Sequence, residues 1–365
     1  MFNNKYKRLR VLVTGHTGFK GSWLSAWLIK LGAEVAGYSS SIPTIPSHFE
    51  MIRLSGQLRH FIGDIRDYDR LIEVFKEFKP EVVFHLAAQP IVSVALKSPK
   101  ETFDINLIGS INVMEAVRNT PSVKAAVFIT SDKCYENVEW EFGYRENDRL
   151  GGKDPYSASK ACAEIALRSY YLSYVKGQMP LKMVTARAGN VIGGGDWGQD
   201  RVVPDCIRNW SENRPVQIRN PNSTRPWQHV LEPLSGYLWL GALLLDDKAG
   251  IDGEAFNFGP GGEINIPVSA LLEKMRSIWG GGSWKVIRTA DIAKKEASLL
   301  KLSCDKAFYL CGWVSNLTFE ETVKMTMEWY TEWNREKDGN MAPVTSSHIS
   351  KFENIALERD RVWAK

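Results

Sequence analysis

The feature that most constrains the fold is an apolar run, a glycine-rich turn and a helical pattern that follow one another near the start of the chain. Residues Arg10–Thr14 read RVLVT, a short apolar run typical of a buried strand. Residues Gly15–Gly21 read GHTGFKG, and Trp23–Leu31 then continues with apolar residues at helical spacing. A strand, a glycine turn and a helix in this order predict a parallel sheet that is covered by helices.

Strands and helices alternate along the first half of the chain. Further strands are expected at Glu34–Tyr38, His60–Asp64, Glu81–Ala88, Ala125–Thr130 and Leu181–Arg187, and helices at Tyr68–Phe78, Thr102–Arg118 and Pro155–Lys176. This alternation predicts an α/β fold with a doubly wound parallel sheet of the Rossmann type. The alternation ends beyond these strands, since residues 189–227 are rich in loops and residues from about 261 suggest a second, smaller C-terminal lobe.

The glycine turn indicates a dinucleotide-binding site. Gly15, Gly18 and Gly21 allow a tight turn and a close approach of the backbone to a pyrophosphate at the N-terminus of the following helix. The spacing is Gly-x-x-Gly-x-x-Gly, whereas Gly-x-Gly-x-x-Gly is the usual pattern of dinucleotide-binding turns. In such sheets the ligand lies at the carboxyl ends of the strands.

A tyrosine and a lysine four residues apart are candidates for catalysis. Tyr156 and Lys160 would share one face of the predicted helix, and Ser131 directly follows a predicted strand. A phenol titrates near pH 10, but a cation about 4 Å away supplies on the order of 4 kcal/mol at an effective dielectric of about 20. We therefore expect Lys160 to lower the pKa of Tyr156 by about three pH units. Tyr156 would then deprotonate an alcohol held by Ser131 while the alcohol carbon gives up hydride.

The glycine spacing and the Tyr-x-x-x-Lys pair together resemble the extended branch of the short-chain dehydrogenase/reductase superfamily, which acts on nucleotide sugars. Residues 131–135 (SDKCY), residues 187–197 (RAGNVIGGGDW) and the glycine turn resemble the CDP-glucose 4,6-dehydratase family within that branch. The resemblance runs along nearly the whole chain. It implies NAD as the cofactor, CDP-glucose as the substrate and CDP-4-keto-6-deoxyglucose as the product.

The resemblance also implies which residues contact NAD. The acidic residue that usually binds the adenosine ribose after the second strand is missing, and Ser39 offers a hydroxyl in its place. Asp64 matches a position that contacts adenine, although it could equally cap a helix. Lys20, unusual in this turn, is expected either near the pyrophosphate or in solvent. The full set of expected NAD contacts is Gly15, His16, Gly18, Phe19, Gly21, Ser39, Asp64, Ile65, Leu86, Ala87, Ala88, Tyr156 and Lys160.

Further catalytic roles are implied for the two residues that follow Ser131. A 4,6-dehydratase oxidises C4, eliminates water across C5–C6 and returns hydride to C6, which requires an acid at the leaving hydroxyl and a base at C5. Asp132 matches the acid. Lys133 replaces the glutamate base of dTDP-glucose dehydratases, so we expect it to act as the C5 base, to stabilise the enolate or to orient Asp132. As a base it would have to be neutral, which burial beside Lys160 would favour.

Three other functions are compatible with these residues. A nucleotide-sugar 4-epimerase needs only the serine, tyrosine and lysine, and a dehydratase could act on the hexose of another nucleotide. An NAD-sensing binding protein that kept the fold is the alternative without catalysis.

Substrate contacts are expected after the last strand of the Rossmann part. By resemblance, Asn190 contacts the sugar, and Arg225 binds the diphosphate, where a guanidinium fork suits two oxyanions. Asp196, Trp197 and Arg201 lie in the segment that usually forms the nucleotide pocket, and Trp197 is a candidate for stacking on the base.

Composition and charge argue against other classes of protein. The net charge is only +4 and no block of like charges occurs, so nucleic-acid binding is not expected. The longest apolar stretch, Tyr237–Leu245, is about half a membrane span, and residues 1–10 show no secretory signal. The five scattered cysteines and six histidines show neither a disulfide framework nor metal-ligand spacing, which favours a reducing cytoplasm.

The chain is expected to divide into two parts and a tail. Residues 1–188 would form the NAD-binding domain, to which residues 226–260 return. Residues 189–225 and 261–344 would form the nucleotide-sugar-binding lobe. Residues 345–365 are polar and would be either a docked tail or disordered. The resemblance further implies a homodimer or homotetramer that associates through the helices predicted at Thr102–Arg118 and Pro155–Lys176.

Overall fold

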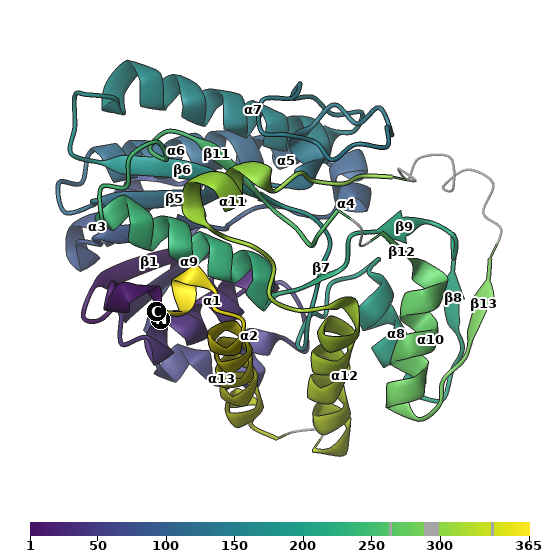
Figure 1. Cartoon of the computed structure of the whole chain (residues 1–365). Helices are drawn as coiled ribbons and strands as arrows, with labels where there is room; N and C mark the ends of the chain where they lie inside the picture. Colours follow the sequence, from purple (N-terminus) through teal and green to yellow (C-terminus); the bar gives the residue numbers. More distant parts are fainter. Residues whose placement is uncertain (263–264, 288–298, 337–338) are drawn as a thin grey trace.

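A seven-stranded parallel sheet forms the centre of the protein (Figure 1). The computed structural model describes residues 1–262, 265–287, 299–336 and 339–365. The strands are β1 (Arg10–Thr14), β2 (Glu34–Ser39), β3 (Arg59–Ile62), β4 (Val82–His85), β5 (Ala125–Ile129), β6 (Lys182–Ala188) and β11 (Ala255–Phe258). Their order is β3-β2-β1-β4-β5-β6-β11, and the chain reverses its direction of winding between β1 and β4. This is the doubly wound Rossmann order, so the predicted fold class is confirmed.

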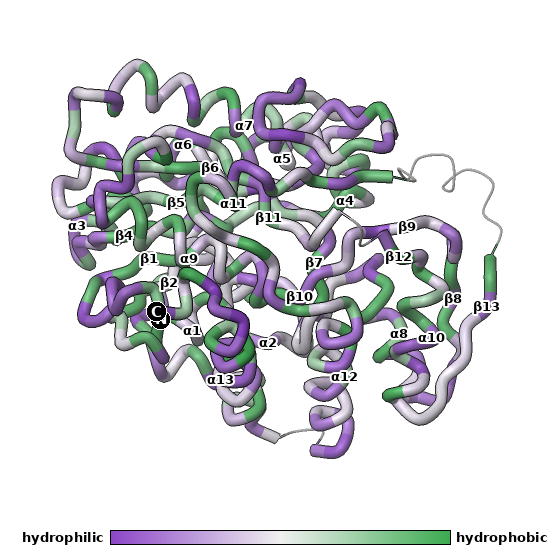
Figure 2. The backbone as a smooth tube through the Cα atoms, viewed as in Figure 1, coloured by the Kyte–Doolittle hydropathy of each residue, from purple (hydrophilic) through white to green (hydrophobic). Residues whose placement is uncertain are grey.

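Helices cover both faces of the sheet. Helices α3 (Tyr68–Phe78), α6 (Gly109–Arg118) and α7 (Pro155–Tyr170) pack on one face, and α1 (Phe19–Lys30) and α9 (Leu231–Leu245) pack on the other. Successive strand residues point to opposite faces, and both faces are buried, which explains why the strands read as continuous apolar runs. Figure 2 shows the hydrophobic segments concentrated in these central strands.

Two predicted helices contain a wider helical turn. Where one helix was predicted over residues 102–118, the structure has α5 (Pro99–Phe103), a π-helical turn (Asp104–Ile108) and then α6. Helix α7 likewise ends in a π-helical turn (Tyr171–Val175). A π turn shifts the hydrogen bonds by one residue within a continuous helix, and amphipathic spacing alone does not reveal such a shift.

Short strands and helices from two chain segments form a smaller group beside the sheet (Figure 1). Strands β8 and β13 pair, as do β9 with β12 and β7 with β10, while α10 packs against α12. The α-helices and strands of the described residues not yet given are α2 (His48–Met51), α4 (Val92–Lys97), β7 (Val191–Ile192), α8 (Val202–Trp210), β8 (Val216–Ile218), β9 (Thr224–Arg225), β10 (Gln228–His229), β12 (Ile266–Pro267), α10 (Val268–Trp279), β13 (Trp284–Val286), α11 (Asp305–Cys311), α12 (Phe319–Arg335) and α13 (Ala342–Glu358). Residues 263–264, 288–298 and 337–338 of the predicted lobe lie outside the described residues. The division into domains stays a prediction.

The C-terminal residues, whose state the sequence left open, are docked onto the first helix. Trp363 stacks on Phe2 with ring centroids 5.3 Å apart. The indole Nε1 of Trp27 donates to Glu353 of α13 at 2.8 Å. The tail is therefore a helix with a buried apolar face. No helix in the described ranges is long and apolar enough to cross a membrane.

Helix α9 carries a buried carboxyl group that should make stability depend on pH. Glu232 is 1% exposed and accepts hydrogen bonds from the backbone N–H groups of Asn316 (2.8 Å) and Leu317 (2.6 Å). Burial raises the pKa of Glu232 to about 7, while these hydrogen bonds act in the opposite direction. The folded state therefore binds more protons than the unfolded chain between pH 4.5 and about 7, so stability falls as the pH rises through this window.

We expect Glu232→Gln to remove this contribution, which amounts to about 3 kcal/mol between pH 4.5 and pH 8. Urea unfolding at a series of pH values should show a flatter profile for the variant than for the wild type. Glu320→Gln, at the exposed start of α12, is the control and should follow the wild type. Equal slopes for all three proteins would contradict the assignment.

Candidate active site

Four of the predicted catalytic side chains lie together at the carboxyl edge of the sheet. Ser131 and Asp132 directly follow β5, and Tyr156 and Lys160 lie on the first turns of α7, which packs against the turn after β5. All four are buried. The fifth predicted residue, Lys133, belongs to the same turn, but its side chain is exposed.

Local capping fixes both segments. The hydroxyl of Ser131 accepts a hydrogen bond from the backbone N–H of Lys133 at 3.2 Å and so caps the 3-10 turn Asp132–Cys134. Asp154 caps α7 by accepting from the backbone N–H of Ser157 at 3.0 Å. A proline follows Asp154 at the first helical position, where its fixed φ suits the start of a helix.

Ser131 lies close to both the carboxyl group and the phenol. It donates to Oδ1 of Asp132 at 3.0 Å, and its side chain lowers the pKa of Tyr156. The serine hydroxyl therefore lies between a potential base and a potential acid. A sugar placed over Ser131 would have both groups within reach.

Burial controls the protonation of Tyr156 and Lys160. It raises the pKa of Tyr156 to about 12, although the Ser131 side chain and the charge of Arg201 lower it. The phenol pKa is therefore raised in this structure, and Lys160 is not among the largest influences on it. Burial also lowers the pKa of Lys160 to about 8, and the nearby carboxylate of Glu164 opposes this effect.

The environment of Asp132 suits a proton donor. Burial raises the pKa of its carboxyl group, and the positive charge of Lys133, the hydrogen bond from Ser131 and the charge of Lys20 oppose this shift. A raised pKa keeps a carboxylic acid protonated closer to neutral pH. The side chain of Lys133 is exposed, and its charge acts on Asp132.

Lys20 is close enough to the candidate acid Asp132 to interact with it electrostatically. It lies on the first turn of α1, is half-buried, and interacts electrostatically with Asp132, Asp196, Lys160 and Arg201. Burial, together with the neighbouring cations, lowers its pKa to about 8. The sequence offered one signal for this position, because Lys20 is the one lysine, arginine, aspartate or glutamate in the glycine turn GHTGFKG.

The glycine turn is packed backbone against backbone. Gly15 has φ +76°, and a Cβ atom there would lie 2.7 Å from the backbone nitrogen of Ala87. A Cβ on Gly21 would lie 2.1 Å from the carbonyl oxygen of Gly15. Neither position admits a side chain, so the turn keeps a backbone cradle of the kind that a pyrophosphate requires. The other predicted NAD contacts near this edge are Gly18 and Phe19 at the start of α1, Ile65 after β3, and Leu86, Ala87 and Ala88 after β4.

The predicted ribose and adenine contacts already have protein partners. His16 belongs to the turn after β1, and its ring contacts the Ser39 hydroxyl of β2 at 2.9 Å and His60 of β3 at 2.7 Å. Burial lowers the pKa of His16 to about 3, so its ring is neutral. Asp64 does not cap helix α3, whose N-cap is Asp67. Its carboxylate accepts from the backbone and guanidinium of Arg66.

Two of the predicted substrate residues form an ion pair, and a third is part of the core. Arg201 pairs with the buried Asp196 at 2.9 Å. Trp197 is 3% exposed and packs edge-on against Tyr330 and Trp333. The structure therefore places Trp197 in the core of the smaller lobe, and its predicted stacking on a base is not supported.

The remaining substrate candidates lie near a small cavity beside Asp132. A Cβ on Gly189 would lie 2.8 Å from Oδ2 of Asp132, and the Asn190 carbonyl accepts from the backbone of Gln228. Arg225 lies on β9 and donates to the Thr224 carbonyl. The cavity is lined by Gly189, Pro226, Gln228, Gly259, Pro260, Gly261, Gly262, Lys301 and Leu302. Within the described part of the chain, no group of three or more His, Cys, Asp or Glu side chains could hold a metal ion.

A doubly wound sheet with a glycine turn after β1, and a buried serine, tyrosine and lysine at its carboxyl edge, define an enzyme of the short-chain dehydrogenase/reductase type. The family model for GDP-mannose 4,6 dehydratase matches residues 12–326, and the chain belongs to this family. The family relationship expected from the motifs is thereby confirmed.

Relatives include both dehydratases and epimerases. The chain is 46% identical to a CDP-glucose 4,6-dehydratase of Salmonella typhimurium, covering 92% of this chain and 94% of that protein. The structure of an epimerase from Methanothermobacter thermautotrophicus superposes with a TM-score of 0.79 at 25% identity, covering 92% and 96%. The NAD complex of Thermus thermophilus UDP-glucose 4-epimerase gives 0.74 at 26% identity, covering 88% and 99%.

We expect the Lys20 ammonium to titrate near pH 8, which can be measured by NMR of ¹³C-methylated lysines with Lys20→Arg as the assignment variant. Because the Asp132 carboxylate raises the pKa of Lys20, Asp132→Asn should lower it further. Asp69→Asn, on α3, is the control and should leave the titration unchanged. A Lys20 signal that titrates above pH 10 would show that the side chain points into solvent.

Proposed function

We propose that the protein is an NAD-dependent 4,6-dehydratase that converts CDP-glucose into CDP-4-keto-6-deoxyglucose. The observation that carries this proposal is the buried, hydrogen-bonded Ser131–Asp132 pair, which lies beside the buried Tyr156 at the edge where the cofactor would bind. The 46% identity with a CDP-glucose 4,6-dehydratase supports both the reaction and the nucleotide.

The backbone of the glycine turn would hold the pyrophosphate of NAD, and Tyr156 and Lys160 would face its nicotinamide ribose. The tight packing around Gly15 and Gly21 supports this fit. NAD supplies the group that accepts hydride from C4 and later returns it to C6. The positive charge of the bound nicotinamide would also lower the pKa of Tyr156, opposing the effect of burial.

In the first half of the reaction, Tyr156 would remove the proton of the C4 hydroxyl, while Ser131 holds that oxygen by a hydrogen bond. In the second half, Asp132 would donate a proton to the C6 hydroxyl as it leaves. The raised pKa of Asp132 supports this role. The proton on C5 must leave in the same step, and we propose that Lys133, which follows Asp132 in the turn, takes this proton and returns it to C5 when hydride reaches C6.

On the substrate side, we propose that Asn190 binds the sugar and that Arg225 binds the diphosphate. Asp196 and Arg201 would border the nucleotide. The second candidate function is a 4-epimerase, which the structural relatives favour at 25% and 26% identity. An epimerase has no use for an acid beside the serine, so Asp132 favours the dehydratase.

Product analysis by mass spectrometry tests the reaction and the nucleotide together. The protein should remove one water from CDP-glucose with no net formation of NADH, and should leave dTDP-, UDP- and GDP-glucose unchanged. Dehydration of another nucleotide's sugar would keep the reaction and overturn the substrate. An unchanged mass with inverted C4 would establish the epimerase.

Asp132→Asn should separate the two halves of the reaction. We expect at least about a hundredfold loss of dehydration, because the amide cannot donate the acidic proton. Oxidation at C4 should persist and appear as a transient NADH absorbance at 340 nm in a single turnover. Asp247→Asn, which removes an exposed carboxylate paired with Lys182, is the control. Equal loss of both steps would contradict the role of Asp132.

We also propose that two copies associate through the face formed by α6 and α7 with their π turns. Apolar side chains are exposed on this face, including Ile108 (45%), Ile165 (58%) and Leu172 (47%). Light scattering should give a dimer or tetramer, and Ile165→Glu should give a smaller species. Leu357→Glu, at an equally exposed position (52%) on α13, should not. A monomeric wild type at micromolar concentration would contradict the association.

A further inference from the structure

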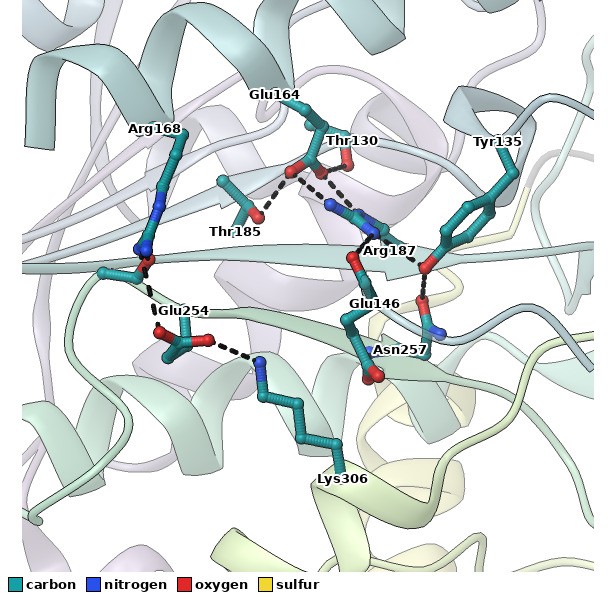
Figure 3. Close-up of polar contacts among 11 residues, drawn as sticks. Thr130, Tyr135, Glu146, Glu164, Arg168, Thr185, Arg187, Glu254, Asn257 and Lys306 are labelled. Atoms are coloured by element: carbon teal, nitrogen blue, oxygen red, sulfur yellow. Dashed lines mark hydrogen bonds and ion pairs between the residues drawn. The ribbon is translucent and has the colours of Figure 1, made fainter. Parts of the chain in front are cut away.

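A buried ion pair lies one helical turn beyond the catalytic lysine. Glu164 follows Lys160 by four residues on α7, and it pairs with Arg187 of β6 through two parallel hydrogen bonds (Figure 3). Nε of Arg187 donates to Oε1 and Nη2 donates to Oε2, both at 2.9 Å. Both side chains are 4% exposed. Two such bonds fix the relative orientation of the helix and the strand.

Two threonine hydroxyls complete the coordination of the Glu164 carboxylate. Thr130 donates to Oε1, and Thr185 of β6 donates to Oε2 at 2.8 Å. Each carboxylate oxygen thus accepts two hydrogen bonds, which fills its capacity. The carboxylate therefore joins α7 to two neighbouring strand positions at once.

The remaining nitrogen of Arg187 contacts Tyr135, the residue after the 3-10 turn Asp132–Cys134, which we call the catalytic turn. Its Nη1 donates to the hydroxyl of Tyr135 at 2.7 Å and to the Glu146 carbonyl at 3.0 Å. Tyr135 in turn donates to Asn257 of β11 at 2.7 Å (Figure 3). The arginine thus ties α7 and β6 to the residue that follows the 3-10 turn Asp132–Cys134.

The two anchor points bracket the catalytic residues in the sequence. Thr130 directly precedes Ser131, and Tyr135 directly follows the turn that contains Asp132. Both ends of the catalytic turn are therefore held by one ion pair, and that pair is fixed to the helix that carries Tyr156. The distance between the Tyr156 phenol and the Ser131–Asp132 pair depends on this arrangement.

We propose that Glu164 and Arg187 are positioning residues, which hold Ser131 and Asp132 in register with Tyr156 and Lys160. The inference rests on the proposed function and deepens it. A buried ion pair contributes little net stability, because removing two charges from water offsets their attraction. A hydrophobic pair of similar volume could fill the same space, but it would not fix the orientation of α7 relative to β6.

Glu164 also acts on Lys160 through its charge. Its carboxylate raises the pKa of Lys160 and opposes the effect of burial. Three other ionisable groups interact with Lys160: Cys134 of the catalytic turn, Lys20 of α1 and His85 of β4. Because Glu164 is the nearby carboxylate among them, its removal should favour the neutral form of Lys160.

The two threonines provide a matched test of positioning. Thr130→Val and Thr185→Val each remove one hydrogen bond to the same carboxylate, and both sites are buried. We expect Thr130→Val to lower kcat at least about tenfold with KM for CDP-glucose within about twofold, because only Thr130 adjoins Ser131. Thr185→Val should keep kcat within about twofold. Equal losses of kcat in the two variants would overturn the proposal.

Glu164→Gln tests the electrostatic part, and Glu254→Gln is its control. Glu254 pairs with Arg168 of α7 and Lys306 of α11 at the protein surface (Figure 3). The limb of the pH–rate profile that reflects deprotonation of Lys160 should move to lower pH in Glu164→Gln only. A profile that coincides with the wild type would overturn this part. If Glu164→Gln does not fold, the threonine pair decides.

The two proposals fail in different ways. A wild-type protein that does not dehydrate CDP-glucose would overturn the proposed function. The positioning inference would then be judged by NMR titration of ¹³C-methylated Lys160, which should titrate at lower pH in Glu164→Gln than in Glu254→Gln. Identical titrations would overturn it as well.

Discussion

The structure depends on the close contact of backbone with backbone at the turn between β1 and α1. Gly15 lies so near to Ala87 that a single methyl group would separate the two segments. Because β1 and β4 are neighbours at the point where the sheet reverses its winding, this contact sets the geometry of the whole carboxyl edge. The first turn of α1, including Lys20, is directed at the catalytic residues for the same reason.

Desolvation is the dominant electrostatic effect in the site. It raises the pKa of Tyr156 to about 12 and lowers the pKa values of Lys160 and Lys20 to about 8, so it favours the neutral form of each group. Hydrogen bonds and neighbouring charges oppose burial only in part. A site of this kind responds strongly to any charge that enters it, such as a cationic nicotinamide or an anionic diphosphate.

The same sheet serves dehydratases and epimerases among the relatives, so the fold does not decide the reaction. We propose that the turn after β5 decides the reaction in this protein. There, Asp132 stands beside the serine in a buried position with a raised pKa, and the Glu164–Arg187 pair holds both ends of the turn. An elimination needs a proton donor at the leaving hydroxyl and a base at C5, and in the proposed function Asp132 would be the donor.

The sequence by itself determined the class of fold, the glycine turn, the family and the grouping of Ser131, Asp132, Tyr156 and Lys160 in one site, because each depends on spacing along a single strand, turn or helix. The tertiary structure decided which of the charged residues are buried. Lys20 is half-buried, Lys133 is exposed, Trp197 belongs to the core, and Glu164 of α7 meets Arg187 of β6. These outcomes depend on contacts between segments far apart in the chain, and on the loss of water around them, which no local pattern records.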